Sequence, residues 1–258
     1  MRPDYKNWVP RSMVLALYAG ALLSFLLFLL TLQLNGNKTL GTLLLILSLV
    51  FLFYAVWMDA LHRTFDYRGK RKMAKTIIEG TASYVTLPEG GFGLDVGCGS
   101  GALTIACAKR NPHAKMVGCD IWSGAYKAVF TRQLCEENAK AEGVDNVSFE
   151  EGNAVSLPFE NESFDAVTSN YVYHNISFQN KQKLLEETLR VLKKGGTFAI
   201  HDLMSKARYG DMEAFVRKLK EKGYEEVRLI NTTDGMFMNK KEALLLGLSG
   251  STLLVGRK

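Results

Sequence analysis

A glycine-rich turn preceded by an acid is the part of this 258-residue sequence best suited to chemistry. It reads LDVGCGSG over residues 94–101, between a predicted strand and a predicted helix. Glycines let a backbone turn sharply and approach a ligand closely, and the free amides at the start of a helix then face that ligand. The GxGxG spacing, with Asp95 two residues before the first glycine, disfavours a pyrophosphate and suits an ammonium group. No lysine of the phosphate-loop type follows, which argues against a P-loop.

Polar residues also end the next two predicted strands. Asp120 lies about twenty residues beyond the turn, where an acid can bond both hydroxyls of a ribose. Asn153 and Ala154 end the following strand, where a side-chain amide and a backbone N–H can bond the edge of an adenine. Ligands of open α/β sheets bind outside the carboxyl ends of the strands. The turn, Asp120 and Asn153 together therefore predict a site for a nucleotide-type cofactor.

Two histidines and a tyrosine are candidates for accepting a proton. His174 and His201 lie at predicted strand ends near the cofactor, and histidine is the side chain best suited to general base catalysis near neutral pH. Each histidine also has an alternative interpretation as a packed or helix-capping polar residue. Tyr171 is a further candidate, although a tyrosine at such a place is more commonly a wall residue. An acceptor that ionises easily would need no base.

The cysteines show no pattern typical of metal binding. Cys98, Cys107, Cys119 and Cys135 occur without CxxC pairs and without a histidine cluster at ligand spacing. We therefore expect no metal site and no disulfide, and the pattern favours small core residues.

Strand and helix patterns alternate from residue 92 onward. The predicted strands are 92–96, 115–119, 147–151, 164–169, 197–201, 226–230 and 251–256, and the predicted helices are 66–85, 102–110, 125–141, 180–192 and 211–222. Such alternation predicts parallel βαβ units, whose right-handed crossovers place helices on both faces of an open sheet. The segment 235–247 carries Met236, Leu244 and Leu245 around two lysines. Two interpretations stay open for it, a surface that touches a bilayer or a capped core helix.

Four stretches resemble the class I S-adenosylmethionine-dependent methyltransferases in order and spacing. They are LDVGCGSG, GCDIW, EGNAVSLPFENESFDAVTSNYVYHN and VLKKGGTFAIHD, all within residues 94–202. The resemblance implies an α/β, Rossmann-like seven-stranded sheet with a reversed final strand, and S-adenosyl-L-methionine as cofactor. It implies that the methionine end is held by Asp95, Gly97, Cys98, Gly99 and Gly101, the ribose by Asp120, and the adenine by Ile121, Trp122, Asn153 and Ala154, with Asn170 beside the methyl group.

Two departures from the resemblance concern the adenine and the acceptor. Asn153 stands where an aspartate is common in the family, and an amide can also bond the adenine. The segment 169–175 is not of the N-P-P-Y type found in amino methyltransferases of nucleic acids, which argues against nucleic acid as the acceptor. The two other classes considered are an NAD-dependent dehydrogenase and a non-catalytic cofactor-binding protein.

The first sixty residues predict a membrane hairpin. Residues 13–34 and 40–58 contain no charged side chain, and each run is near the ~20 residues that a helix needs to cross a bilayer. A short polar turn joins them. The alternatives are a cleaved signal peptide, which the second apolar run disfavours, and a buried hairpin in a soluble core.

Basic residues flank the hairpin on the side away from its turn. Three of them, Arg2, Lys6 and Arg11, precede the first run, and Arg63, Arg68, Lys70, Arg71 and Lys72 follow the second. This distribution predicts that both termini and the catalytic domain face the cytoplasm. We therefore interpret the formal net charge of +6 as a sign of contact with a membrane surface rather than with nucleic acid.

These patterns predict three parts: a transmembrane hairpin over 1–61, a linker with an N-terminal helix over 62–86, and a methyltransferase domain over 87–258. The expected activity is methyl transfer to a small, lipophilic acceptor at the cytoplasmic face of the membrane. A membrane protein is the alternative acceptor. No feature of the sequence specifies an oligomeric state.

Overall fold

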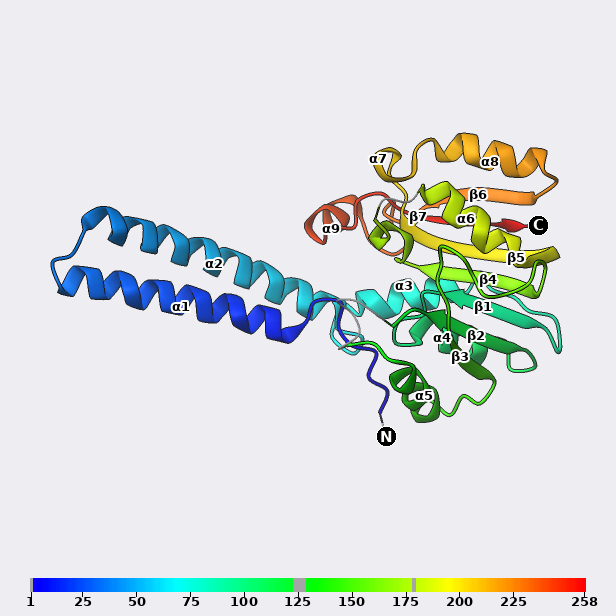
Figure 1. Cartoon of the computed structure of the whole chain (residues 1–258), viewed down its shortest axis with the longest axis horizontal. Helices are drawn as coiled ribbons and strands as arrows, with labels where there is room; N and C mark the ends of the chain where they lie inside the picture. Colours follow the sequence, from blue (N-terminus) through cyan, green and yellow to red (C-terminus); the bar gives the residue numbers. More distant parts are fainter. Residues whose placement is uncertain (1, 123–128, 178–179) are drawn as a thin grey trace. The chain divides into compact units, whose positions relative to one another are not determined.

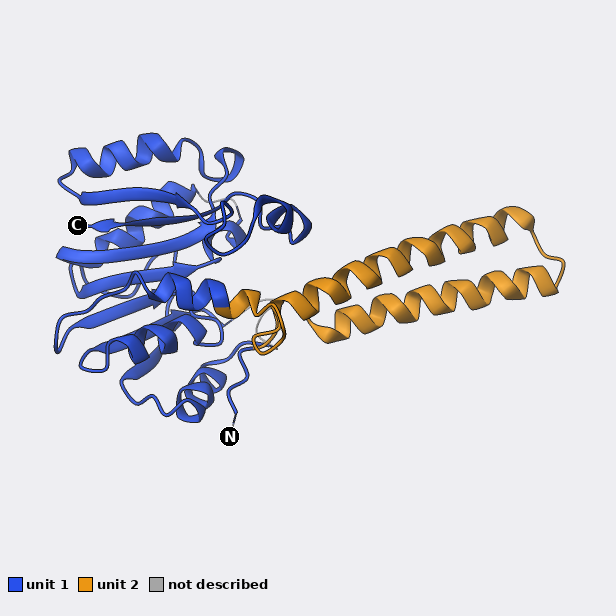
Figure 2. Cartoon of the chain, turned by 180° about the vertical axis from the view of Figure 1, so that it is seen from behind, with its two compact units in different colours: residues 1–5, 76–258 blue, residues 6–75 orange. Residues whose placement is uncertain are grey.

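The computed structural model describes residues 2–122, 129–177 and 180–258 (Figure 1). The chain forms two compact units (Figure 2). We call residues 6–75 the hairpin unit, and residues 2–5 together with 76–258 the sheet unit. The first residues of the chain thus belong to the same unit as its last.

Two long antiparallel helices, α1 (Arg11–Gln33) and α2 (Lys38–Phe65), make up most of the hairpin unit. Asn37 starts α2, because its side-chain oxygen accepts hydrogen bonds from the backbone N–H groups of Thr39 and Leu40. Such a cap satisfies amides that have no partner within the helix. Both helices are long and apolar enough to cross a membrane. The second helix runs seven residues beyond the predicted span that ends at 58.

The sheet unit is built on seven strands. They are β1 (Phe92–Val96), β2 (Lys115–Asp120), β3 (Val147–Glu151), β4 (Phe164–Asn170), β5 (Leu192–Leu203), β6 (Glu225–Asn231) and β7 (Ser251–Arg257). Their order is β3-β2-β1-β4-β5-β7-β6, and β7 runs antiparallel to both of its neighbours, β5 and β6, while the other pairs are parallel. The predicted α/β class, the seven strands and the reversed final strand are confirmed. The strand order reverses between β1 and β4, which is where ligands bind in such sheets.

Helices and one short 3-10 turn connect the strands. They are α3 (Met73–Ala82), α4 (Ala102–Arg110), α5 (Arg132–Ala141), η2 (Tyr173–Asn175), α6 (Lys181–Arg190), α7 (Lys206–Tyr209), α8 (Met212–Glu221) and α9 (Lys240–Leu245). Side chains of Thr131, Asn180 and Asp211 cap the starts of α5, α6 and α8. Two helices begin well after their predicted starts. The helix expected over 66–85 runs from Met73 to Ala82, and residues 66–72, which follow the end of α2 at Phe65, are not helical. The helix expected over 125–141 begins at Arg132, and residues 125–128 lie outside the described part.

The core of the sheet unit lies against the middle strands. Leu94 and Val96 of β1, Val167 of β4 and Ile200 of β5 are fully buried there. These apolar residues anchor the strands whose carboxyl ends carry the polar residues of interest. The fold thereby brings the ends of β1, β2, β3, β4 and β5 to one edge of the sheet.

Candidate active site

The glycine turn after β1 adopts a backbone that side chains would hinder. Gly97, Gly99 and Gly101 all have left-handed φ angles, of 73°, 55° and 78°. A Cβ atom on Gly97 would lie 2.4 Å from a methyl group of Val172, so this turn can approach the end of β4 only as glycine. On Gly99 a Cβ would meet nothing nearer than 4.0 Å. The turn is therefore closely packed at its start and open at its tip, as a ligand cradle requires.

Asp95 lies directly beneath this turn and is buried, with 1% of its surface exposed. The Thr104 hydroxyl donates a hydrogen bond of 2.7 Å to its Oδ2. Burial raises the pKa of Asp95 to about 7, and the nearby negative charge of Asp120 adds to the rise, while the bonds from Thr104 oppose it. A cationic ligand above the turn would favour the ionised carboxylate.

Asp120 ends β2 beside the tip of the turn and is half-buried. Its Oδ2 accepts the N–H of Gly99 at 2.9 Å, and its Oδ1 accepts the N–H of Trp122 at 3.0 Å. The Trp122 indole N–H donates in turn to the carbonyl of Gly99 at 3.0 Å. These bonds fix the carboxylate at the mouth of the turn and leave it further lone pairs for ligand hydroxyls.

An open cleft of about 430 Å³ adjoins Asp120. Its lining residues are Ile121, Glu151, Gly152, Asn153, Ser156 and Pro158. Ile121 is 46% exposed in this cleft. The side-chain oxygen of Asn153 accepts the N–H of Val155 at 2.9 Å, which fixes the amide at the lining of the cleft. The predicted adenine residues Ile121 and Asn153 thus line one hollow, next to the predicted ribose residue.

Two other predicted cofactor residues, Cys98 and Ala154, have buried side chains. Cys98 is buried, burial raises the pKa of its thiol well above the usual range, and its N–H donates to Cys119 at the end of β2. Ala154 is also buried, at 8% exposure. All four cysteines are free and buried, as the sequence predicts for core residues.

A carboxylate–histidine pair lies just beyond the end of β4. Nδ1 of His174 is 2.6 Å from Oδ1 of Asp202, which follows His201 in β5. Asp202 is fully buried, and its Oδ2 accepts the N–H groups of Tyr173 and His174. Burial alone would raise the pKa of Asp202, but the hydrogen bond and charge of His174 and the N–H of Leu203 hold it below its usual value. The ionised carboxylate can only accept, so Nδ1 of His174 carries a proton, and whenever the ring is neutral it is Nε2 that presents a lone pair.

His201 is held differently from His174. Its Nδ1 is 2.9 Å from Oδ1 of Asn170, and its Nε2 is 2.9 Å from the hydroxyl of Thr232. Burial lowers the pKa of His201 to about 3. Both ring nitrogens are occupied and the ring stays neutral, so His201 is a packed polar residue that orients Asn170.

Tyr171 forms a wall between these two histidines. Its ring lies 4.7 Å from His201 and 6.0 Å from His174, between centroids. The hydroxyl is 2.6 Å from Oγ of Ser251, and burial raises the pKa of Tyr171 above its usual value. A phenol held in this way is a poor proton acceptor. The backbone of Tyr171 is left-handed, with φ 54°, a strained conformation of the kind that gathers at functional sites.

Residues 2–5, which we call the N-terminal strap, lie against the glycine turn. The side chain of Asn138 in α5 accepts the N–H of Asp4 at 2.6 Å and donates to its carbonyl at 3.0 Å. The same amide donates to the carbonyl of Ser100 at 3.0 Å. The Ser100 hydroxyl donates to the carbonyl of Tyr5 at 3.0 Å. Asn138 therefore joins the strap, α5 and the turn in one hydrogen-bond network.

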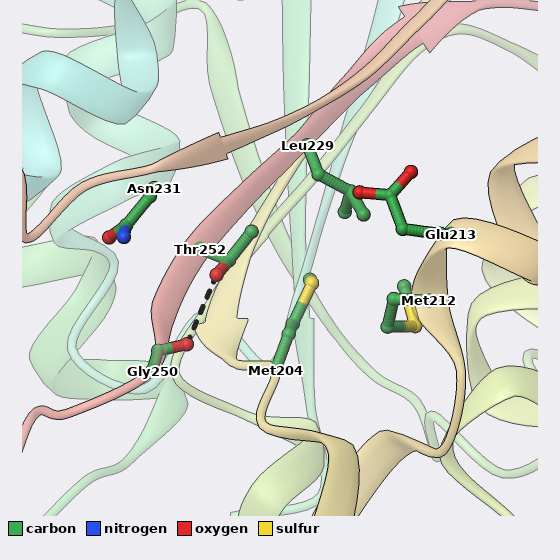
Figure 3. A pocket seen from close by; sticks show the side chains of 7 residues that line it. All are labelled: Met204, Met212, Glu213, Leu229, Asn231, Gly250 and Thr252. Atoms are coloured by element: carbon green, nitrogen blue, oxygen red, sulfur yellow. Dashed lines mark hydrogen bonds between the residues drawn. The ribbon is translucent and has the colours of Figure 1, made fainter.

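A second hollow, of about 250 Å³, lies near α8 and the edge formed by β6 and β7 (Figure 3). Its lining includes Met204, Met212 and Leu229, with one carboxylate from Glu213. The Thr252 hydroxyl at its floor donates to the carbonyl of Gly250. Among the described residues, this lining holds no pair of acid and base groups, in contrast to the edge that carries His174 and Asp202.

Fold and site together define a class: an α/β enzyme that holds a nucleotide-type cofactor across the carboxyl ends of β1, β2 and β3. Residues 90–242, more than half of the chain, match the model of the methyltransferase domain family. The chain belongs to this family, and the protein is an S-adenosylmethionine-dependent methyltransferase.

Named relatives agree with this assignment. A demethylmenaquinone methyltransferase of Geobacillus stearothermophilus is 27% identical over 195 residues, which cover 71% of this chain and 78% of the relative. An uncharacterized methyltransferase of Bacillus subtilis, YcgJ, is 36% identical over 110 residues, or 42% of this chain and 39% of the relative. The chain thus spans about four-fifths of the first relative and about two-fifths of the second.

Solved structures share the fold. A geranyl diphosphate methyltransferase in complex with sinefungin superimposes with a TM-score of 0.53 at 15% identity, covering 74% of this chain and 84% of that one. The [4+2]-cyclase SpnF superimposes with a TM-score of 0.55 at 20% identity, covering 75% and 85%. At these identities the likeness concerns the fold alone.

The residues of the site fit S-adenosylmethionine. Three features of the site adjoin one another. They are the open tip of the turn at Gly99, the carboxylate of Asp120 and the cleft of about 430 Å³. Asp95, Asp120, Ile121 and Asn153 would hold the cofactor there. Bound S-adenosylmethionine supplies a methyl group on a positively charged sulfur.

Sequence reasoning missed Asp202 and Asn138. Asp202 directly follows His201 at the end of a predicted strand, so the rule that functional groups gather at such ends contained a signal for it. Asn138 bonds Asp4 of the strap, which is 134 residues away in the sequence. Nothing in the local pattern of α5 distinguishes Asn138 from other polar residues of a helix.

Proposed function

We propose that this methyltransferase acts on a small, lipophilic acceptor at the cytoplasmic face of a membrane that the hairpin unit crosses. The observation that carries the proposal is the distribution of side chains in that unit. Small residues lie at the helix interface, among them Ala21, Ser24 and Gly41. Large apolar residues point outward, with Leu34 69% and Phe53 68% exposed.

This pattern is the reverse of that in a water-soluble hairpin. Transmembrane helices associate through small residues and polar bonds across the interface, because lipid offers no hydrophobic drive between them. The Ser48 hydroxyl makes such a bond, donating to the carbonyl of Ala21 at 2.9 Å. An unanchored protein would expose this apolar surface to water at a large cost. The same distribution argues against a buried core hairpin.

Tethering favours an acceptor that is dissolved in the membrane, because the anchor raises the local concentration of enzyme around it. Several relatives are named demethylmenaquinone methyltransferases. A demethylmenaquinone is therefore the first defined acceptor to test.

The His174–Asp202 pair supports a role in proton removal. Methyl transfer to a neutral hydroxyl, amine or enol-type carbon requires the acceptor to lose a proton. Asp202 holds Nδ1 of His174 with its proton, so Nε2 is the ring nitrogen that can accept the proton of the acceptor. The ring of Tyr171 packs beside His174, with 6.0 Å between the ring centroids.

The test is to incubate the full-length protein in lipid vesicles with S-adenosylmethionine labelled in its methyl group. One set of vesicles contains a membrane lipid extract and another contains demethylmenaquinone. The Asp120→Ala variant is the control without cofactor binding. We expect label in the organic phase with the wild type only. Label confined to protein, or to water-soluble compounds added in parallel, would contradict the proposed acceptor class.

A further inference from the structure

The segment around α9 presents apolar and basic side chains together on its outer side. Leu244 is 73% and Leu245 64% exposed, and Met236 just before the helix is 41% exposed. Lys240 and Lys241 stand one helical turn before the two leucines, so each lysine lies above a leucine on the same side. We call these five residues the α9 tip. Lys240 forms an exposed ion pair with Asp234 at 3.2 Å.

The inner side of this segment is fixed to the sheet unit. Phe237, Met238 and Ala243 are buried, at 6%, 2% and 2% exposure. Asn239 and Glu242 form a capping box that starts α9. A Cβ on Gly80 of α3 would lie 2.2 Å from the Phe237 ring, so the ring packs directly against the backbone of Gly80. The interpretation of 235–247 as a capped helix packed on the core therefore fits its inner side, and this attachment holds the α9 tip outward.

The same segment adjoins the candidate active site. Thr232 at its start bonds His201, and the ring of Phe237 lies 5.4 Å from that of His201. His201 in turn contacts Tyr171 and bonds Asn170. The α9 tip thus belongs to the edge of the sheet at which the acceptor must arrive.

We propose that the α9 tip docks on the surface of the lipid bilayer, with its leucines among the acyl chains and its lysines at the lipid phosphates. This inference rests on the proposed function, since the hairpin unit in the same chain would hold the sheet unit within reach of a membrane. A basic–apolar face on a short helix is the composition that partitions into the interface between water and hydrocarbon. The consequence is an acceptor that passes from lipid to the active site without crossing water.

The first test places a reporter on the α9 tip of the full-length protein in vesicles of phosphatidylcholine and phosphatidylglycerol. Because the four native cysteines are buried, Leu244→Cys can be labelled selectively with a polarity-sensitive fluorophore. Glu221→Cys is the matched control, at the exposed end of α8 that precedes β6, on the opposite edge of the sheet. We expect blue-shifted emission that spin-labelled lipids quench at position 244, and water-like, unquenched emission at position 221.

The second test asks whether lysine contributes. A lysine near an anionic surface contributes about 1 kcal/mol of attraction, which corresponds to about a fivefold change in the docking equilibrium. Lys241→Gln should therefore reduce by that factor the docking equilibrium constant obtained from lipid quenching at position 244 in vesicles with phosphatidylglycerol. Lys220→Gln, an exposed lysine in α8, should leave it unchanged.

The outcomes separate this inference from the proposed function. The protein is first shown to be inserted, by its flotation with the vesicles. If the emission at position 244 is then as water-like as that at position 221, α9 does not dock on the bilayer. A blue shift without quenching by lipid would also overturn the docking, because a protein surface would then cover the tip. Failure to methylate any lipid, with quenching intact, would instead remove the proposed acceptor and leave the docking in place.

Discussion

Asp202 is the residue on which the proposed proton transfer depends, because it alone among the described residues holds a ring nitrogen of His174. A carboxylate on Nδ1 fixes both the orientation of the ring and the position of its proton. An amide in the same place could present either its oxygen or its nitrogen to Nδ1, and would lack the charge that stabilises the imidazolium formed during transfer.

We predict that Asp202→Asn lowers kcat by about 100-fold or more, the usual contribution of a positioned base. His174→Ala should have a similar effect, and the double variant should be little worse than either, because the two residues act as one unit. Turnover of the first acceptor identified in lipid would be measured alongside cofactor affinity. A loss of cofactor binding in proportion to kcat would point to a purely structural role for Asp202.

Asp95 makes the stability of the protein depend on pH in an unusual direction. Its pKa is about 7 in the folded protein against 3.8 in an ordinary environment, so between these values the folded state holds a proton that the unfolded chain has released. Stability should therefore fall as the pH rises from about 4 to about 7. The full difference corresponds to about 4 kcal/mol.

Chemical unfolding in detergent at about pH 5 and about pH 8 should show this loss in the protein without cofactor. Asp95→Asn, which cannot ionise, should flatten the difference between the two pH values. Adding S-adenosylmethionine should also reduce it, because a cation above the turn stabilises the ionised form. An unchanged slope in Asp95→Asn would assign the pH dependence to another group.

At the scale of elements, local sequence patterns predicted most strands. They failed where a strand depends on hydrogen bonds to backbone that is distant in the sequence. The strand expected over 197–201 extends from Leu192 to Leu203 as β5. Its first residues, KKGG, have the composition of a helix end, yet Gly195 and Gly196 exchange backbone hydrogen bonds with Lys258 at the C-terminus. No local pattern contains that partner. The start of α5 could have been found, since Thr131 is a recognisable N-cap.

The candidate site was predictable to a similar extent. Residues at strand ends, such as Asp120 and Asn153, were identified because type and position agree. Those that act through the tertiary structure, such as Asn138, were not. A histidine at a strand end is ambiguous in sequence, and only the partners distinguish His174, paired with Asp202, from His201, neutral and enclosed.

The N-terminal strap should tighten cofactor binding through Asn138. We predict that Asn138→Ala weakens the affinity for S-adenosylmethionine by about tenfold, because the buried carbonyl of Ser100 loses its donor and the strap is released from the turn. Calorimetric titration of the full-length protein measures this.

Asn146→Ala is the matched control for the strap. The Asn146 amide also donates to backbone carbonyls, those of Ala108, Asn111 and Ala114, at the amino edge of the sheet. It should cost stability without changing cofactor affinity. Equal losses of affinity in both variants would show that general destabilisation, and not the strap, is responsible.

At the scale of the whole molecule, chain connectivity restricts how the hairpin unit meets a membrane. Residues 2–5 and 76–258 belong to one compact unit, and residues 6–75 leave it and return. If α1 and α2 cross a bilayer, they must therefore cross it an even number of times. This agrees with the expectation from basic residues that both ends face the cytoplasm.

We predict that the turn between α1 and α2 alone is accessible from outside an intact cell. Lys38→Cys should react with a membrane-impermeant maleimide in intact cells, whereas Glu221→Cys should react only after the membrane is opened. The native cysteines give little background because they are buried. Reaction of both positions in intact cells, or of the two in reverse order, would contradict the topology.

The strap has a consequence for biosynthesis. A ribosome makes Asp4 before the two apolar helices, and Asn138 only 134 residues after Asp4. The strap therefore has no partner in Asn138 while the helices enter the bilayer and the sheet assembles. The contact of the strap with the glycine turn is then among the last to form. A newly made enzyme would therefore reach its full affinity for the methyl donor only after its helices have entered the membrane.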